Sequence, residues 1–169
     1  MIYAGIGSRE TPSDVMVTMS KLAKYFAHLG WILRSGGANG ADSAFEAGCD
    51  EESGGKEIYL PWKGFNGKVS LLNWISPEAL EMAALYHPAW NKLNDAARRL
   101  MARNCYQVMG GNLDCPSDFI VCWTKDGKAS GGTGQAVRIA IDYGIPVFNL
   151  YNTADRLLLK EFVNKSKGA

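Results

Sequence analysis

Residues that bind metals or form disulfides are scarce in this chain of 169 residues. It has only two histidines and four cysteines, and no two cysteines form a Cys-x-x-Cys pair. A structural zinc site needs four close ligands, usually in two tight pairs, so we expect no metal site. Reduced thiols in a cytoplasmic protein are the expected state of the cysteines. These cysteines are Cys49, Cys105, Cys115 and Cys122.

An excess of charge of either sign is also missing. Eighteen Lys and Arg oppose seventeen Asp and Glu, so the formal net charge at pH 7 is +1. This excludes a strongly basic nucleic-acid-binding arm, and phosphate groups would have to be bound at a local site. No apolar run has the roughly 18 residues of a membrane span. The first ten residues resemble no secretion signal, so we expect a cytoplasmic protein without a membrane partner.

Short apolar runs alternate with longer segments of helical periodicity, and 47% of the residues are hydrophobic. Strands followed by helices imply right-handed crossovers and a parallel sheet. The fold class is therefore α/β, a doubly wound Rossmann-like parallel sheet with helices on both faces, in a single domain spanning 1–169. Predicted strands are 2–6, 31–34, 58–61, 118–123 and 145–150. Predicted helices are 11–29, 39–47, 77–86, 94–109, 130–143 and 153–165.

Two local features refine this prediction. Thr11 is expected as the N-cap of the first helix, with Pro12 at its first position and Asp14 as the acid of a capping box. Residues 63–97 are long for a connection between elements. We expect this segment to be a helical insertion that serves as a lid or as an oligomer contact.

Three glycine-rich turns follow predicted strands. Their sequences are GIGSR at residues 5–9, SGGANG at 35–40 and SGGTG at 130–134. In an open parallel sheet, ligands bind outside the carboxyl ends of the strands. Glycine lets backbone N–H groups approach an anion, and a helix N-terminus adds a positive dipole. The three turns together predict a phosphate-binding site.

Two familiar nucleotide sites are disfavoured. A dinucleotide fingerprint needs a third glycine in the first turn and an acidic residue at the end of the second strand. Residue 10 is Glu10, and the second strand ends in Arg34. The chain also contains no GxxxxGK[ST] sequence, which excludes a P-loop. We therefore expect no dinucleotide cofactor, and no cofactor of another kind is indicated.

The turns resemble one superfamily. Gly7-Ser8-Arg9 and the SGGANGAD of residues 35–42 are similar to the Rossmann domain of the DNA-processing protein A family (DprA/Smf), whose second turn typically reads SGGARGID. GGTG at 131–134 resembles the PGGxGT turn of the LOG family, the cytokinin-activating phosphoribohydrolases. These families share the SLOG fold and bind nucleotides or nucleotide-derived ligands. The likeness spans about 1–60 and 98–150, and small DprA-like proteins are common in phage genomes, which makes a phage origin an expectation.

Departures from these families shape the expected function. The DprA arginine of the second turn is Asn39 here, and the family histidine falls on Glu46, so single-stranded DNA binding is disfavoured. Arg103 stands in the place of the LOG arginine, but Arg138 stands where the LOG glutamate belongs. An arginine does not replace a carboxylate that activates water. The resemblance thus implies a non-catalytic binder of a nucleotide-derived ligand, such as a sensor, carrier or sink. Phosphoribohydrolase activity and single-stranded DNA binding are the alternatives.

The expected site combines the turns with charged and aromatic residues. Arg9, Arg34 and Arg103 are expected to supply charge, with a surface ion pair as the alternative role for Arg9. Trp62, after the third strand, is expected either to stack on a base or to be buried under the segment 63–97. Salt bridges to Glu10 or Asp42 are the alternative role for Arg34 and Arg103. Glu46 and Arg103 are the candidate catalytic residues should the protein be an enzyme. Related folds suggest a homo-oligomer. The expected ligand-binding residues are Gly7, Ser8, Arg9, Arg34, Ser35, Gly36, Gly37, Ala38, Asn39, Gly40, Asp42, Trp62, Arg103, Gly131, Gly132, Thr133 and Gly134.

Overall fold

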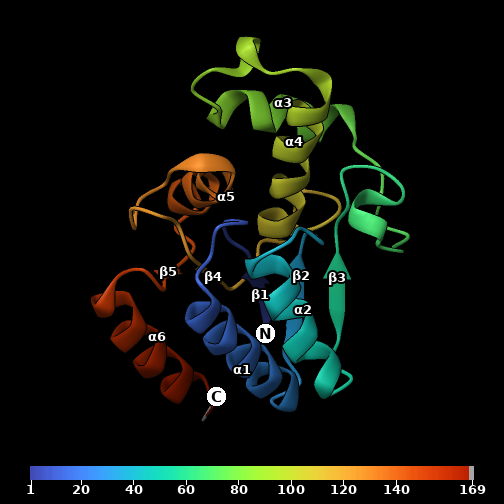
Figure 1. Ribbon diagram of the computed structural model, residues 1–169. Coiled ribbons are helices and arrows are strands. Elements are labelled where there is room, and N and C mark those ends of the chain that lie inside the picture. The colour runs from blue at the N-terminus through green and yellow to red at the C-terminus, as the bar shows by residue number, and fades with distance from the viewer. Residues whose placement is uncertain (168–169) are drawn as a thin grey trace.

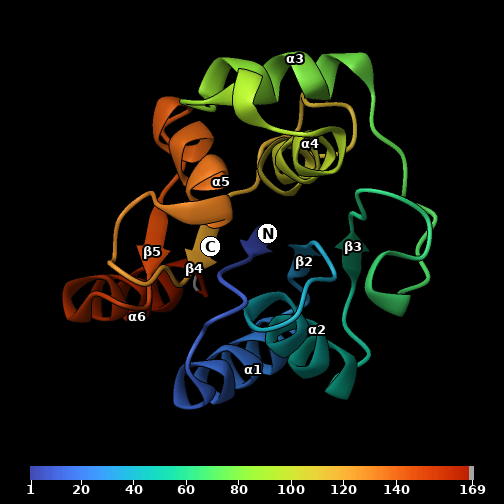
Figure 2. The same cartoon turned by 45° about the horizontal axis from the view of Figure 1, so that its top comes forward.

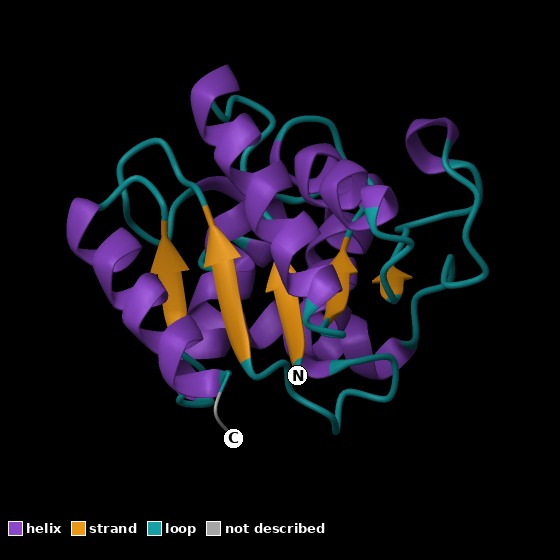
Figure 3. Ribbon diagram, turned by 90° about the horizontal axis from the view of Figure 1, so that it is seen from below, coloured by secondary structure: helices purple, strands orange, loops and turns teal. Residues whose placement is uncertain are grey.

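The computed structural model describes residues 1–167, which form a parallel sheet between two layers of helices (Figures 1 and 3). Its strands all run in the same direction, in the order β3-β2-β1-β4-β5. The predicted α/β fold with a doubly wound sheet is confirmed. The strands are β1 (Ile2–Gly5), β2 (Ile32–Ser35), β3 (Lys56–Ile58), β4 (Phe119–Cys122) and β5 (Val147–Asn149).

The helices divide into two layers. On one face lie α1 (Ser13–His28), α2 (Ala41–Glu51) and α6 (Thr153–Ser166). On the other face lie α4 (Asp95–Met109) and α5 (Gly131–Asp142), and α3 (Pro77–Tyr86) packs on the outer side of α4 (Figure 2). Within residues 1–167, no helix is both long enough and apolar enough to cross a membrane.

Alternation of side chains along the strands creates two separate cores. Tyr3 and Phe119 point to the layer of α1, α2 and α6, where they join Phe26 and Phe45. Their neighbour Ile120 points to the other layer, together with residues of α4 and α5. Successive side chains of a strand face opposite sides, so one short strand contributes to both cores.

Close contact between α1 and α2 depends on a glycine. A Cβ atom at Gly48 would lie 2.0 Å from the backbone oxygen of Ser20 on α1. Gly48 therefore lies inside α2, at the point where the helices meet. The predicted end of this helix at residue 47 is wrong, because Gly48 serves helix packing and α2 continues to Glu51.

Other predicted boundaries also move. Helix α1 begins at Ser13, and the residue at its N-cap is Pro12. The Thr11 hydroxyl donates instead to the Ser8 backbone oxygen over 2.7 Å, so the expected capping role of Thr11 is wrong. Strand β3 ends at Ile58, although it was expected to begin there. Tyr59 N still donates to the Ser35 oxygen of β2 over 2.9 Å, and the chain then leaves the sheet, because Leu60 N donates to the oxygen of Leu72.

Residues 63–97 contain α3 and two short 3-10 helices, Phe65–Gly67 and Trp90–Lys92. Ala79 and Ala83 of α3 are fully buried against α4. Gln135 of α5 donates to the Ala83 oxygen over 2.8 Å, which also fixes α3 to α5. In contrast, Val69 and Leu71 are almost fully exposed.

Candidate functional site

A cleft of about 510 Å³ opens at the carboxyl ends of the central strands. The turns after β1 and β4 leave the sheet toward opposite layers, so the cleft lies at the point where the strand order reverses. Open α/β sheets bind ligands at this position. The cleft is lined by Ile6, Gly7, Ser8, Arg9, Glu10, Ala38, Asp42, Leu100, Met101, Arg103, Asn104, Gln107, Thr124, Lys125, Ser130, Gly131, Gly132 and Thr133.

The first turn of α5 faces this cleft without a side-chain cap. The hydroxyl of Ser130, its N-cap residue, donates away from the helix to Asp126 Oδ1 over 2.6 Å. The amides of Gly131, Gly132 and Thr133 find no hydrogen-bond acceptor within residues 1–167. Free amides at the positive end of a helix of twelve residues attract an anion.

A neighbouring helix fixes the position of this turn. The side-chain amide of Asn104 on α4 donates to the Gly132 backbone oxygen over 2.9 Å. Asn104 is almost fully buried. The start of α5 is therefore held by the side chain of Asn104 on α4 and not by a cap of its own.

A buried ion pair lines the cleft. Arg103 Nη1 lies 3.7 Å from Asp42 Oδ2, and both side chains are more than nine-tenths buried. The same nitrogen donates to the Gly36 backbone oxygen. Arg103 Nε is buried and has no hydrogen-bond partner in the described structure. An unpaired buried donor of a charged group is costly.

The Asp42 carboxylate is surrounded by donors. The Ala38 amide donates to Asp42 Oδ2 over 3.3 Å, and the backbone amides of Gly36 and Gly7 also favour the charged form of the carboxylate. Burial raises the pKa of Asp42 to about 6, while Arg103 and these amides act in the opposite direction. Burial likewise lowers the pKa of Arg103, and the charge of Asp42 counteracts this. The negative charge of Asp42 and the positive charge of Arg103 therefore neutralise each other.

Comparison with known proteins places this geometry in a fold class. The search found no matching family model and no matching curated protein. Among solved structures, DNA processing protein A from Helicobacter pylori matches with a TM-score of 0.57 and 18% identity, over 99% of this chain and 73% of that chain. The chain has the fold of DNA processing protein A. The resemblance predicted from the glycine turns is thus confirmed at the level of the fold.

The molybdenum cofactor carrier protein of Chlamydomonas reinhardtii shares this DprA-type fold. One of its structures matches with a TM-score of 0.55 and 19% identity, over 95% of this chain and 84% of that chain. Another matches with a TM-score of 0.51 and 20% identity, over 88% and 73% of the two chains. At these identities the likeness concerns the fold alone.

The cleft of this DprA-type fold brings together about half of the predicted site residues. All three glycine turns contribute, although the second contributes only Ala38 and the helix residue Asp42. The predicted residues on the cleft wall are Gly7, Ser8, Arg9, Ala38, Asp42, Arg103, Gly131, Gly132 and Thr133. Those not on the wall are Arg34, Ser35, Gly36, Gly37, Asn39, Gly40, Trp62 and Gly134.

Arg34 is directed away from the cleft. Its Nε donates to Glu57 Oε2 over 2.7 Å and its Nη1 to the Cys115 backbone oxygen over 2.6 Å. Arg34 and Glu57 are paired residues of β2 and β3. The expected bridge from Arg34 to Glu10 or Asp42 is wrong, whereas the expected pairing of Arg103 with Asp42 is present.

The other distant residues have structural contacts. Trp62 packs edge-on against Phe65, with ring centroids 5.2 Å apart, in a small satellite core. The Gly37 oxygen accepts from Asn66 Nδ2 over 3.0 Å, and Asn39 Oδ1 accepts from the same amide over 2.9 Å. The Ser35 hydroxyl donates to the Gly5 oxygen and joins neighbouring strands.

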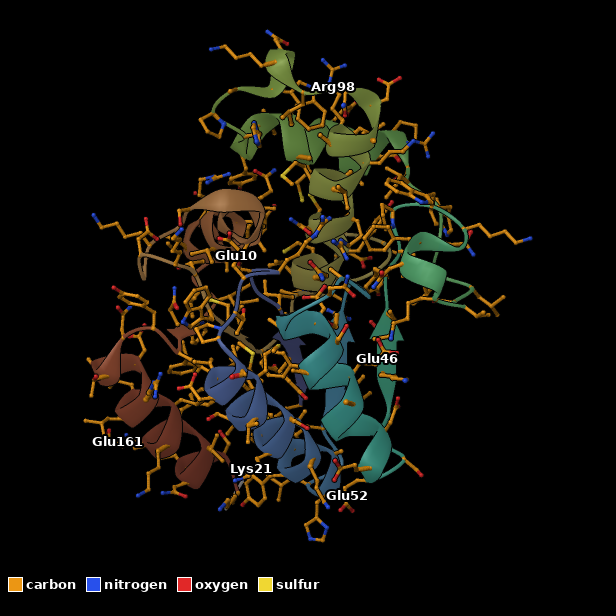
Figure 4. The ribbon with its side chains drawn as sticks, viewed as in Figure 1. Glu10, Lys21, Glu46, Glu52, Arg98 and Glu161 are labelled. Atoms are coloured by element: carbon orange, nitrogen blue, oxygen red, sulfur yellow. The ribbon has the colours of Figure 1, made fainter. Side chains whose placement is uncertain are left out.

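Glu46, the candidate acid, also lies outside the cleft. Its carboxylate is 3.1 Å from Lys68 Nζ and 3.5 Å from Lys56 Nζ. Figure 4 shows Glu46 on the β3 side of α2, away from Glu10, which lies near α5. The Arg138 side chain donates to the backbone oxygens of Tyr86 and Ala129, so it too is directed away from the cleft.

Sequence reasoning missed one wall of the cleft. Leu100, Met101, Asn104 and Gln107 all come from α4, the helix that already supplies Arg103. Their spacing of three and four residues places them on one helix face, and this pattern was available in the sequence. The segment 63–97 contributes no residue to the wall. No cluster of three potential metal ligands occurs within the described residues.

Proposed function

We propose that the cleft binds a nucleotide-derived small molecule without turning it over, and that the phosphate of this ligand sits on the amides of Gly131, Gly132 and Thr133. The observation that carries the proposal is the uncapped start of α5, facing a cleft that Arg103 also lines. The free amides of this turn can donate together to one acceptor-rich group such as a phosphate.

The rest of the cleft suits the remainder of such a ligand. Ile6, Leu100 and Met101 provide an apolar wall that a planar ring can cover. Ser8 and Thr124 add hydroxyls that can bond to a sugar. The cleft thus combines one apolar wall with many polar groups, as a ligand with a ring, a sugar and a phosphate would require.

The structural relatives support binding as the shared property. DNA processing protein A from Helicobacter pylori binds single-stranded DNA, and the protein from Chlamydomonas reinhardtii is a carrier of the molybdenum cofactor. A carrier binds its cargo without chemistry, which is the mode proposed for this chain.

Calorimetry with a nucleoside monophosphate and the matching unphosphorylated nucleoside tests the proposal. The monophosphate should bind at least about tenfold more tightly. Gly132→Pro removes one amide donor, and proline is tolerated in the first turn of a helix. This variant should lose at least about tenfold in affinity. Thr153→Pro, at the first position of α6, is the matched control and should bind as the unmodified protein does. Equal binding of nucleoside and monophosphate contradicts the proposal.

Phosphoribohydrolase activity is the first alternative. The carboxylates on the cleft wall are Glu10, which is mostly exposed, and Asp42, which accepts from the Ala38 amide and pairs with Arg103. A general acid or base must reach the reacting atoms with a free oxygen. Glu46 points away from the cleft, which favours binding over hydrolysis.

Single-stranded DNA binding is the second alternative, favoured by the fold shared with DNA processing protein A. Arg9 and Lys125 at the cleft mouth are the cations that would contact a strand. Fluorescence anisotropy with a labelled oligothymidylate tests it, because affinity carried by phosphates falls steeply with salt. Competition by a nucleoside monophosphate would show whether both ligands use one site.

A further inference from the structure

The second glycine turn already binds an anion, and that anion belongs to the protein. The Asp42 carboxylate accepts a hydrogen bond of 3.3 Å from the Ala38 amide of the second turn, and the backbone amides of Gly36 and Gly7 also favour its charged form. Arg103 completes the set at 3.7 Å. This arrangement of amides and an arginine around a carboxylate is that of an anion-binding site whose occupant is a side chain.

The position of Asp42 in α2 explains why it reaches this place. It is the second residue of the helix, and Gly40 at the N-cap has no side chain to satisfy the first amides. The positive end of a helix favours a negative group in its first turn. In a strand–turn–helix unit, this is the location where a phosphate group would otherwise bind.

We propose that Asp42 is a built-in anion that fills the second of two anion positions, so that the cleft accepts a ligand with one phosphate group and rejects diphosphates and triphosphates. This inference rests on the proposed function for the first position, at the start of α5. A second phosphate directed toward the turn of residues 35–40 would meet a carboxylate in a poorly solvated place, and like charges repel strongly there.

The charges of the cleft wall agree with a single phosphate. Arg103 is neutralised by Asp42, and Lys125 lies 4.0 Å from Glu10. Among the cations that line the described cleft, Arg9 is the one without an ion pair. One unpaired cation and one helix N-terminus match a phosphate monoester.

The first experiment compares the mono-, di- and triphosphates of one nucleoside by calorimetry. The unmodified protein should bind the monophosphate at least about tenfold more tightly than the diphosphate. In Asp42→Gly the carboxylate is gone and its space is open, so this preference should shrink or reverse. Asp50→Asn, on the exposed side of the same helix, is the control and should keep the preference. An unchanged preference in Asp42→Gly overturns the inference.

The second experiment covers the case in which Asp42→Gly is poorly folded. Inorganic phosphate should then replace the missing carboxylate and raise the melting temperature of this variant much more than that of the unmodified protein or of Asp50→Asn. Equal effects of phosphate on all three proteins overturn the inference. This readout does not depend on a nucleotide. If no nucleoside phosphate binds the unmodified protein while phosphate raises the melting temperature of Asp42→Gly, the proposed function is wrong. The inference that Asp42 occupies an anion position is then still supported.

Discussion

Asn104 and Gly132 connect two helices by a hydrogen bond of 2.9 Å from the side-chain amide to the backbone oxygen. Arg103, the preceding residue of α4, pairs with Asp42. Two consecutive residues of one helix thus hold the two anion positions of the cleft, the first turn of α5 and the second glycine turn. Helix α4 therefore fixes the position of the first turn of α5 relative to the second glycine turn.

Asn104→Ala should weaken ligand binding more than it weakens the fold. Loss of one hydrogen bond to a backbone oxygen costs about 1 kcal/mol in stability. The start of α5 would then be free to shift, and we expect about tenfold weaker binding of a nucleoside monophosphate. Calorimetry and urea unfolding measure the two effects. Full affinity in a folded Asn104→Ala protein would argue against this positioning role.

Gly36→Ala should destabilise the protein by disrupting the ion pair. A Cβ at residue 36 would lie 1.5 Å from Arg103 Nη1 and 2.5 Å from Gln107 Nε2. Displacing Arg103 leaves Asp42 buried without its partner, at a cost of about 2 to 4 kcal/mol. Gly55→Ala is the control, because its Cβ would meet only Ile32 at 3.4 Å. Equal unfolding midpoints of the two variants would contradict this expectation.

Asp42 should give stability a distinct pH dependence. Its folded-state pKa of about 6 lies above the ordinary value of 3.8. At a pH between 3.8 and about 6, Asp42 is protonated in the native state and ionised in the unfolded state. The contribution of Asp42 to the unfolding free energy therefore falls as the pH rises through this range, and it is constant at higher pH. The fall is about 3 kcal/mol at most. The stability difference between the unmodified protein and Asp42→Asn should therefore decrease from about pH 4 to pH 7. A difference that rises with pH would be the contrary result.

Incubation with purine nucleoside monophosphates should release no free base above the control without protein. Arg138→Glu should gain little activity, because Arg138 bonds to Tyr86 and Ala129 and does not line the cleft. Liquid chromatography of the reaction measures the base. If the unmodified protein releases base and Glu46→Gln does not, hydrolysis with Glu46 as the acid is the correct function.

The segment 63–97 should mediate a homo-oligomer. Val69 is 100% exposed and Leu71 is 94% exposed, an unusual state for large aliphatic side chains. Replacing both with serine should shift a dimer toward the monomer in sedimentation velocity without lowering the melting temperature. Val17→Ser, at an exposed position on α1, is the control. A monomer at all concentrations in the unmodified protein would rule out this role.

The fold was predictable because local signals agreed with the global arrangement. Apolar runs marked the strands, helical periodicity marked the crossovers, and glycine followed β1 and β2 and opened α5. The exact strand limits were not predictable, because they depend on pairing. Arg34 faces Glu57 only because β3 begins at Lys56, two residues before the predicted strand.

The candidate site was predictable as a place but not as a set of contacts. A glycine turn looks the same in sequence whether its amides point to a ligand or to a carboxylate of the same chain. At the second turn the amides face the carboxylate of Asp42. Only the fold shows this carboxylate beside the amides of Gly7, Gly36 and Ala38. Gly48 is similar, because its role depends on Ser20 of another helix.

The two cores on either side of the sheet share few side chains, but the cleft is walled by both layers. Asp42 belongs to the layer of α1, α2 and α6, and Arg103 and Gly132 belong to the layer of α4 and α5. A ligand in the cleft would therefore contact both helix layers and link two separately packed cores. Its binding should slow amide hydrogen exchange in both layers together, including at positions on α1 and α5 far from any contact with the ligand.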